Sequence, residues 1–232
     1  MERTDNVGVN KTREGRGSRI FVLVVLALLL LAILAAVFVP LGIYRSRGKV
    51  MVSYGNVTVR RDLYLYWLSA CKYDYLKDQI RAGIDATDTP AYWNGTTPDG
   101  ITRAEDVRAK ADAWIKRVVF SAACFEEEGG VLNKKQSADL AGAYERLLQY
   151  ELSDKKAFDA AAKPLGFRYS TVRRALFWQT EGEIYVSPLS DDGFAAFCAL
   201  AESEVEIRSA ASKIDVASIG TDARLYSPAF LP

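Results

Sequence analysis

The sequence lacks histidine, and this absence removes several classes of chemistry. None of the 232 residues is histidine, so the usual general base, the commonest metal ligand and the side chain that titrates near neutral pH are missing. Catalysis by a Ser-His or Cys-His arrangement is therefore excluded. The net charge is +1 with both signs mixed along the chain, and no basic stripe indicates a nucleic-acid-binding protein.

Cysteine is scarce as well. Cys71, Cys124 and Cys198 lie far apart in the sequence and form no CxxC pattern. Each stands among apolar or aromatic neighbours, which favours a small buried side chain. If the domain lies outside the cell, one pair could instead form a disulfide and leave one thiol over. The sequence does not select that pair.

The motifs that carry common enzyme chemistry are missing too. The chain has no P-loop, no Gly-x-Gly-x-x-Gly, no Gly-x-Ser-x-Gly and no ligand set with metal spacing. Ser153 and Lys156 match the Ser-x-x-Lys spacing, but no companion signature accompanies them, and Ser153 is better explained as a helix cap. We therefore expect no enzyme activity, cofactor or metal site.

A long apolar run near the start of the chain is the clearest positive signal. Residues 20–44 form 25 consecutive residues without a charge, whereas about 20 apolar residues suffice to span a bilayer core as a helix. A cleaved secretory signal is the alternative, but its apolar region usually has about 7 to 15 residues and ends in a small-x-small site. The run therefore predicts one uncleaved transmembrane helix.

The flanking charges predict the orientation of this anchor. Lys and Arg are retained on the cytoplasmic side of a membrane. Five basic residues precede the run, and three to five follow it: Arg3, Lys11, Arg13, Arg16 and Arg19 before it, and Arg45, Arg47 and Lys49, then Arg60 and Arg61, after it. We expect residues 1–19 to be a cytoplasmic tail and the chain after the anchor to lie outside a cell membrane.

The rest of the chain predicts a mainly α domain with a small β-hairpin. Two β-prone runs between residues 49 and 59 flank Gly55-Asn56, which suits a two-residue hairpin packed on helices. Helices are predicted from Arg61, after a capping box at Thr102 and Glu105, and after Asn133. Further helices are predicted from Ser153, Ser170 and Ser190. Residues 45–185 are the predicted helical domain, and residues 186–232 a helix with a frayed or partly ordered tail.

Aromatic residues are concentrated in two segments. The helix after Arg61 is apolar on more than one side, so it either lies deep in a bundle or presents a surface to a partner. Residues 83–100 carry dense turn signals around Tyr92 and Trp93. Those two rings either pin the loop to the core or belong to a binding surface. Residues 183–189 are compatible with a strand or a helix end.

The order of these segments resembles the amino-terminal chaperone region of SurA-like and PrsA-like extracytoplasmic foldases. The resemblance covers residues 49–180: the hairpin, the aromatic helix DLYLYWLSACKYDYL, the Tyr-Trp loop and the long helix ending at Gly129-Gly130. The stretch 130–136 (GVLNKKQ), Ala157-Phe158 to Gly166, and Ser170 to Leu176 then occupy the places of the family's later helix starts.

This resemblance implies a holdase for unfolded or exported chains, often followed in the family by a parvulin-type prolyl isomerase domain. This chain departs there, since about 50 residues follow Gln179, whereas a parvulin domain needs about 100 and uses histidines. The resemblance therefore implies the polypeptide-binding region without the catalyst, with peptidyl-prolyl isomerase activity as the catalytic alternative.

We accordingly expect an apolar and aromatic cradle that binds unfolded or exported polypeptides without reading a specific polar code. The candidate peptide-binding residues are Tyr64, Tyr66, Trp67, Tyr92, Trp93 and Trp114, with packing in the core as the alternative for each. The alternative function is a non-catalytic structural or assembly partner of a membrane or envelope complex. The expected partners are polypeptides and the lipid bilayer, with a possible homo-oligomer and no nucleic acid.

Overall fold

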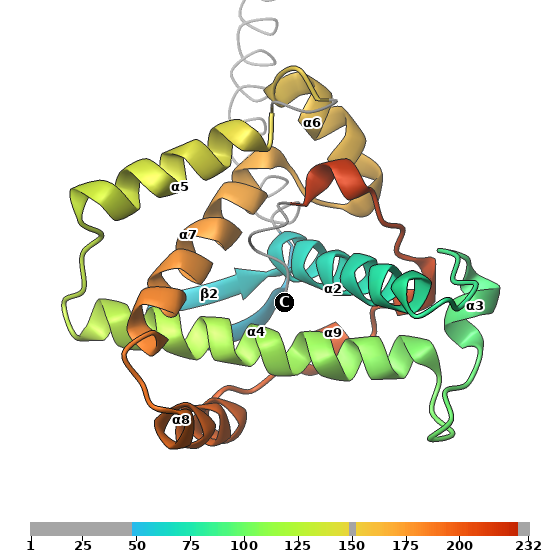
Figure 1. Cartoon of the computed structure of the whole chain (residues 1–232), viewed down its shortest axis with the longest axis horizontal. Coiled ribbons are helices and arrows are strands. Elements are labelled where there is room, and N and C mark those ends of the chain that lie inside the picture. The colour runs from blue at the N-terminus through green and yellow to red at the C-terminus, as the bar shows by residue number, and fades with distance from the viewer. Residues whose placement is uncertain (1–47, 149–151, 227–232) are drawn as a thin grey trace, which may run out of the picture. The chain divides into compact units, whose positions relative to one another are not determined.

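Helices dominate the structure, and one antiparallel hairpin completes it (Figure 1). The computed structural model describes residues 48–148 and 152–226. The predicted cytoplasmic tail, residues 1–19, and the predicted anchor, residues 20–44, lie outside the described residues. Within the described part, the predictions of a mainly α fold and of one small hairpin are confirmed.

The hairpin forms where the sequence predicts it. Strand β1 (Val50–Tyr54) pairs with β2 (Val57–Arg60), and Gly55 at the turn has a φ of +52°, which glycine adopts without a steric penalty. A Cβ atom on Gly55 would lie 3.3 Å from the Cβ of Ala123, on a neighbouring helix. The hairpin therefore packs on the helices, as expected.

Two long helices form the centre of the domain and lie side by side in Figure 1: α2 (Arg61–Arg81) and α4 (Arg103–Glu127). Every residue of α2 from Leu63 to Lys72 is buried, so the deep position considered for this helix is the one observed. The start of α4 is fixed by the predicted capping box. Thr102 accepts a hydrogen bond from the Glu105 amide, and the Glu105 carboxylate accepts one from the Thr102 amide.

Shorter helices surround this pair: α3 (Pro90–Asn94), α5 (Lys134–Arg146), α6 (Lys155–Ala162), α7 (Tyr169–Val186) and α8 (Asp191–Glu204), with the 3₁₀ turn η1 (Lys163–Leu165). The capping box predicted at Asn133 and Gln136 is present. The cap of α6 is Asp154, which accepts from the Ala157 amide at 2.8 Å, and not Ser153. Helix α7 begins at Tyr169 and continues to Val186. Residues 183–189, which are compatible with a strand or a helix end in the sequence, therefore start as the end of this helix.

Residues 207–226 of the tail, which was expected to be frayed or partly ordered, lie against the domain, whereas residues 227–232 lie outside the described residues. The former include α9 (Ser209–Ser212) and the turns η2 (Val216–Ser218) and η3 (Ala223–Leu225). The amide of Arg208 donates to the carbonyl of Met51 at 2.8 Å, beside an antiparallel bridge between Val52 and Ile207. We call residues 207–226 the strap.

Two cations of the central helices hold the strap by its backbone. Arg108 of α4 donates to the carbonyls of Ala211 and Ile214. Lys72 of α2, whose side chain is completely buried, donates to the carbonyls of Val216 and Ile219. The order of the strap thus depends on donors more than 100 residues earlier in the sequence, which local patterns do not reveal.

Asp88 neutralises the buried cation and ties a third segment to this site. Its carboxylate lies 3.1 Å from the Lys72 ammonium and accepts hydrogen bonds from the Trp93 indole at 2.7 Å and from the Thr221 amide at 2.7 Å. The Lys72 ammonium also lies 4.5 Å from the centre of the Trp93 ring. A buried charge is tolerated when it is paired and hydrogen-bonded in this way, so the cluster has a structural role.

Candidate functional site

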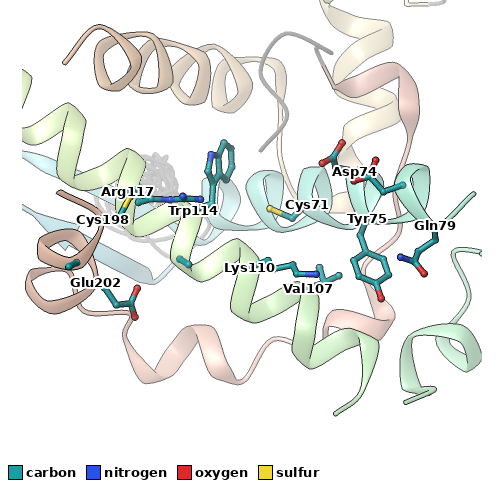
Figure 2. A pocket seen from close by; sticks show the side chains of 13 residues that line it. Cys71, Asp74, Tyr75, Gln79, Val107, Lys110, Trp114, Arg117, Cys198 and Glu202 are labelled. Atoms are coloured by element: carbon teal, nitrogen blue, oxygen red, sulfur yellow. The ribbon is translucent and has the colours of Figure 1, made fainter. Parts of the chain in front are cut away.

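A groove follows one face of α4. Its larger part is a cavity of about 740 Å³ lined by residues of α2, α4 and α8, and Figure 2 shows the side chains around it. A second cavity of about 250 Å³ lies between α4, α7 and α8. Trp114 and Arg117 line both cavities, so the two adjoin at these residues. We call the two cavities together the α4 groove.

The path of the groove follows the helical repeat of α4. Its lining on this helix includes Val107, Lys110, Trp114, Arg117 and Ser121. Steps of three and four residues return to the same face of an α-helix. From the first to the last of these positions the helix rises about 21 Å at 1.5 Å per residue, the length of about six residues of extended chain. The groove is therefore long enough for a short peptide segment.

Three aromatic side chains line the smaller cavity: Trp114, Phe194 and Phe197. Trp114 is half-buried, and its ring meets that of buried Trp67 edge-on at 5.8 Å, which fixes the indole against the core. Across the cavity, Phe194 is 40 % exposed and stacks on Phe197 at 6.3 Å. Aromatic rings held in fixed positions offer apolar area at little cost in side-chain entropy.

Most charged side chains that line the larger cavity already have partners. Asp74 pairs with Lys77, Lys110 with Asp106, and the Glu202 carboxylate lies 2.7 Å from the Lys116 ammonium. Such pairs at the rim of a cavity contribute little to stability because water screens them. They do mean that these charges are balanced within the protein.

Arg117 differs from its neighbours. Among the residues that the structure describes, no carboxylate forms an ion pair with it, and its buried Nε atom has no hydrogen-bond acceptor. Its guanidinium lies close enough to Cys71 to favour the thiolate, although burial is the larger effect and raises the pKa of that thiol. Arg117 is thus a cation at the junction of the two cavities that forms no ion pair within the described part of the chain.

The buried thiol of Cys71 is not activated for nucleophilic chemistry. Cys71 and Cys198 line the larger cavity, and all three cysteines of the chain are free. Because burial raises the pKa of Cys71, this side chain stays a protonated thiol at neutral pH, and the thiolate is the reactive form. Residues 48–148 and 152–226 contain no group of three side chains suited to hold a metal ion.

Four of the six predicted peptide-binding residues are core residues in the structure. Tyr64, Tyr66, Trp67 and Trp93 are at most 2 % exposed. The Tyr64 hydroxyl donates to Asp112 at 2.6 Å, and the Tyr66 ring packs edge-on against Phe167 at 5.3 Å. These four rings are packed in the core, which is the alternative given for each of them. A polypeptide can contact them only if the core opens.

The remaining two candidates are partly exposed but lie apart. Trp114 lines the α4 groove, whereas Tyr92 lines neither of its cavities. Tyr92 meets Trp93 edge-on at 5.3 Å and lies under the Arg103 guanidinium at 4.6 Å from the ring centre. These contacts place Tyr92 in the attachment of the 83–100 loop. Trp114 is therefore the candidate that the structure brings to the groove.

Several groove residues were missed from the sequence. The aromatic wall contributed by Phe194 and Phe197 belongs to α8, which the sequence shows only as an amphipathic helix. Arg117 stands three residues after Trp114, and this spacing is the one signal that could have drawn attention to it. The missing information is the placement of α8 against α4, which depends on tertiary packing.

Comparisons of the chain with protein-family models, curated proteins and solved structures find no match. Of the helices in the described part of the chain, none is both long enough and apolar enough to cross a bilayer.

Proposed function

We propose that this protein is a membrane-anchored, extracytoplasmic, chaperone-like protein that binds unfolded or exported polypeptides in the α4 groove. The observation that carries the proposal is that the groove is long enough for a peptide segment and has the aromatic side chains of Trp114 and Phe194 in its lining. Burial of apolar side chains contributes about 25 cal/mol per Å² whatever the order of residues. Such a groove suits clients that share exposed apolar surface and no sequence motif.

The resemblance of residues 49–180 to the chaperone region of SurA-like and PrsA-like foldases supports the same function. In this proposal, Trp114 is the direct contact among the residues predicted from the sequence. Trp67 supports it from the core through the edge-on contact at 5.8 Å. The other buried aromatics stabilise α2, on which one side of the groove is built.

A client-aggregation assay with the full chain in nanodiscs tests the proposal. We expect the protein to suppress light scattering by a chemically denatured client as it is diluted into buffer. Phe194→Ser removes an exposed ring from the groove wall and should weaken this suppression. Val131→Ser is the matched control, because Val131 is 84 % exposed and lies outside the groove lining. Equal suppression by both variants, or none by the unaltered chain, would reject the proposed site.

The proposed location rests on residues 1–44 and needs a separate test. A reporter that is active only outside the cytoplasm, fused after Pro232, should be active if residues 20–44 anchor the chain with residues 1–19 in the cytoplasm. Activity of a cytoplasm-specific reporter at the same site would reject the extracytoplasmic part of the proposal and leave the groove itself to the aggregation assay.

A second candidate function is that of a non-catalytic assembly partner in a membrane or envelope complex. One observation favours it: Leu200 on α8 is 52 % exposed and lies outside the groove lining, so apolar surface extends beyond the groove. A fixed partner would yield one specific, saturable crosslinked product from this surface. Graded binding to many unrelated peptides would instead favour the chaperone.

A further inference from the structure

Arg117 gives the α4 groove a chemical preference that apolar binding alone does not supply. Its Nε is buried without an acceptor, although guanidinium N–H groups are strong donors. Because Nε itself is buried, a ligand in the groove would bind the terminal Nη groups, which form no ion pair or hydrogen bond with the residues that the structure describes. The best-fitting acceptor for a guanidinium is a carboxylate, which can accept two parallel hydrogen bonds.

The other charges in the groove leave this role to Arg117. On the larger cavity, Lys110, Asp74 and Glu202 are each paired inside the protein. On the smaller cavity, Glu183 is the acidic residue of the lining; it forms no ion pair with Arg117, and burial raises its pKa, which disfavours its charged form. A carboxylate brought by a ligand would therefore meet a cation with free hydrogen-bonding capacity.

The position of Arg117 indicates which kind of carboxylate fits. Because Arg117 borders both cavities, a chain that reaches it from the larger cavity has the aromatic wall of Phe194 and Phe197 still ahead of it. A terminal carboxylate at Arg117 would end the chain there and leave one cavity unfilled. An acidic side chain inside the segment lets the backbone continue past Arg117, with an apolar side chain against Trp114 and Phe194.

We propose that the α4 groove selects extended polypeptide segments in which an internal acidic side chain, bound by Arg117, stands next to a large apolar side chain, bound between Trp114 and Phe194. This inference rests on the proposed function, since it names the class of client that the groove prefers. It predicts a preference among peptides that a purely apolar groove would not have.

Two fluorescent peptides of about six residues, the span of the groove, test the preference by anisotropy with the full chain in nanodiscs. They share an aromatic residue beside a central position, which holds Glu in one and Gln in the other, and both carry an amidated terminus. A charge-assisted hydrogen bond predicts that the Glu peptide binds about 10- to 100-fold more tightly. A third peptide, with central Gln and a free terminal carboxylate, should bind like the amidated Gln peptide.

Variants assign the preference to Arg117. Arg117→Gln should reduce the Glu-to-Gln affinity ratio to about one, mainly by weakening binding of the Glu peptide. Arg174→Gln, which alters an exposed arginine of α7 outside the groove lining, should keep the ratio. Equal binding of the two peptides by the unaltered chain, a ratio that persists in Arg117→Gln, or tight binding by the free terminus alone would overturn the inference while the proposed function stands. Absence of binding by all peptides would overturn both.

Discussion

Glu181 of α7 offers a sharp test of how burial governs the stability of this fold. The residue is 5 % exposed, and its Oε2 atom has no hydrogen-bond partner among the described residues. Burial is the main cause that raises the pKa of this carboxyl from 4.5 to about 7, and repulsion from Glu126 of α4 is the smaller cause. The folded protein therefore favours the neutral acid, whereas the unfolded chain ionises it near pH 4.5.

The sign of the pH dependence follows from proton binding. Between pH 4.5 and about 7 the folded state holds a proton at Glu181 that the unfolded state has released. The free energy of unfolding therefore falls as the pH rises through this window. Above the window, Glu181 no longer changes the free energy of unfolding with pH. One pKa unit corresponds to about 1.4 kcal/mol, so the full shift sets a limit of roughly 3 kcal/mol; with solvent screening we expect about 1 to 2 kcal/mol.

Glu181→Gln removes the ionisation and keeps the shape of the side chain. Urea denaturation of the full chain in detergent, followed by tryptophan fluorescence, should show the variant about 1 to 2 kcal/mol more stable than the unaltered protein at pH 8. The two should be equally stable near pH 4.5. Glu127→Gln is the control, since Glu127 is exposed at the end of α4, and it should leave the pH profile unchanged.

Proton uptake by Glu181 on folding is refuted if the free energy of unfolding of Glu181→Gln changes with pH between 5 and 7 as steeply as that of the unaltered chain. It is also refuted if the variant is destabilised by the same amount at pH 5 and pH 8. Either result would mean that the carboxyl of Glu181 gains no proton on folding.

Other substitutions have expected outcomes that the same urea titrations measure. Lys72→Met should lower the free energy of unfolding by about 2 to 4 kcal/mol, because Asp88 loses its cation and two carbonyls of the strap lose a donor. Thr102→Ala should cost about 1 kcal/mol through loss of the α4 cap. Gly166→Ala should destabilise the turn after η1 by about 1 kcal/mol or more, since φ is +85° there and the added methyl group would lie 2.7 Å from a Leu65 methyl carbon. For each, an unchanged urea midpoint would contradict the assigned contact.

The features that the sequence predicts correctly are determined by neighbouring residues. The capping boxes at Thr102 and Asn133 join residues three positions apart, and the hairpin depends on Gly55 at its turn. The cap of α6 could not be predicted from neighbouring residues alone. Ser153 and Asp154 are both good caps, and the backbone conformation, which the sequence does not display, selects Asp154.

The features that were missed depend on distant packing. The aromatic residues of α2 are apolar enough for a binding surface, and only the arrangement of the surrounding helices buries Tyr64, Tyr66 and Trp67. The groove likewise exists because α8 lies against α4 and brings Phe194 into the lining of the same cavity as Trp114. Which aromatic side chain reaches the surface is decided by the tertiary fold.

The strap has a consequence for the order in which the chain acquires its structure during synthesis. Lys72 donates to carbonyls 144 and 147 residues later, and Arg108 donates to one 103 residues later. Until the ribosome has released residues 211–219, these two cations have none of those acceptors, and long-range contacts of this kind form late. We therefore expect the nascent chain to remain incompletely folded until residues 211–219 have left the ribosome.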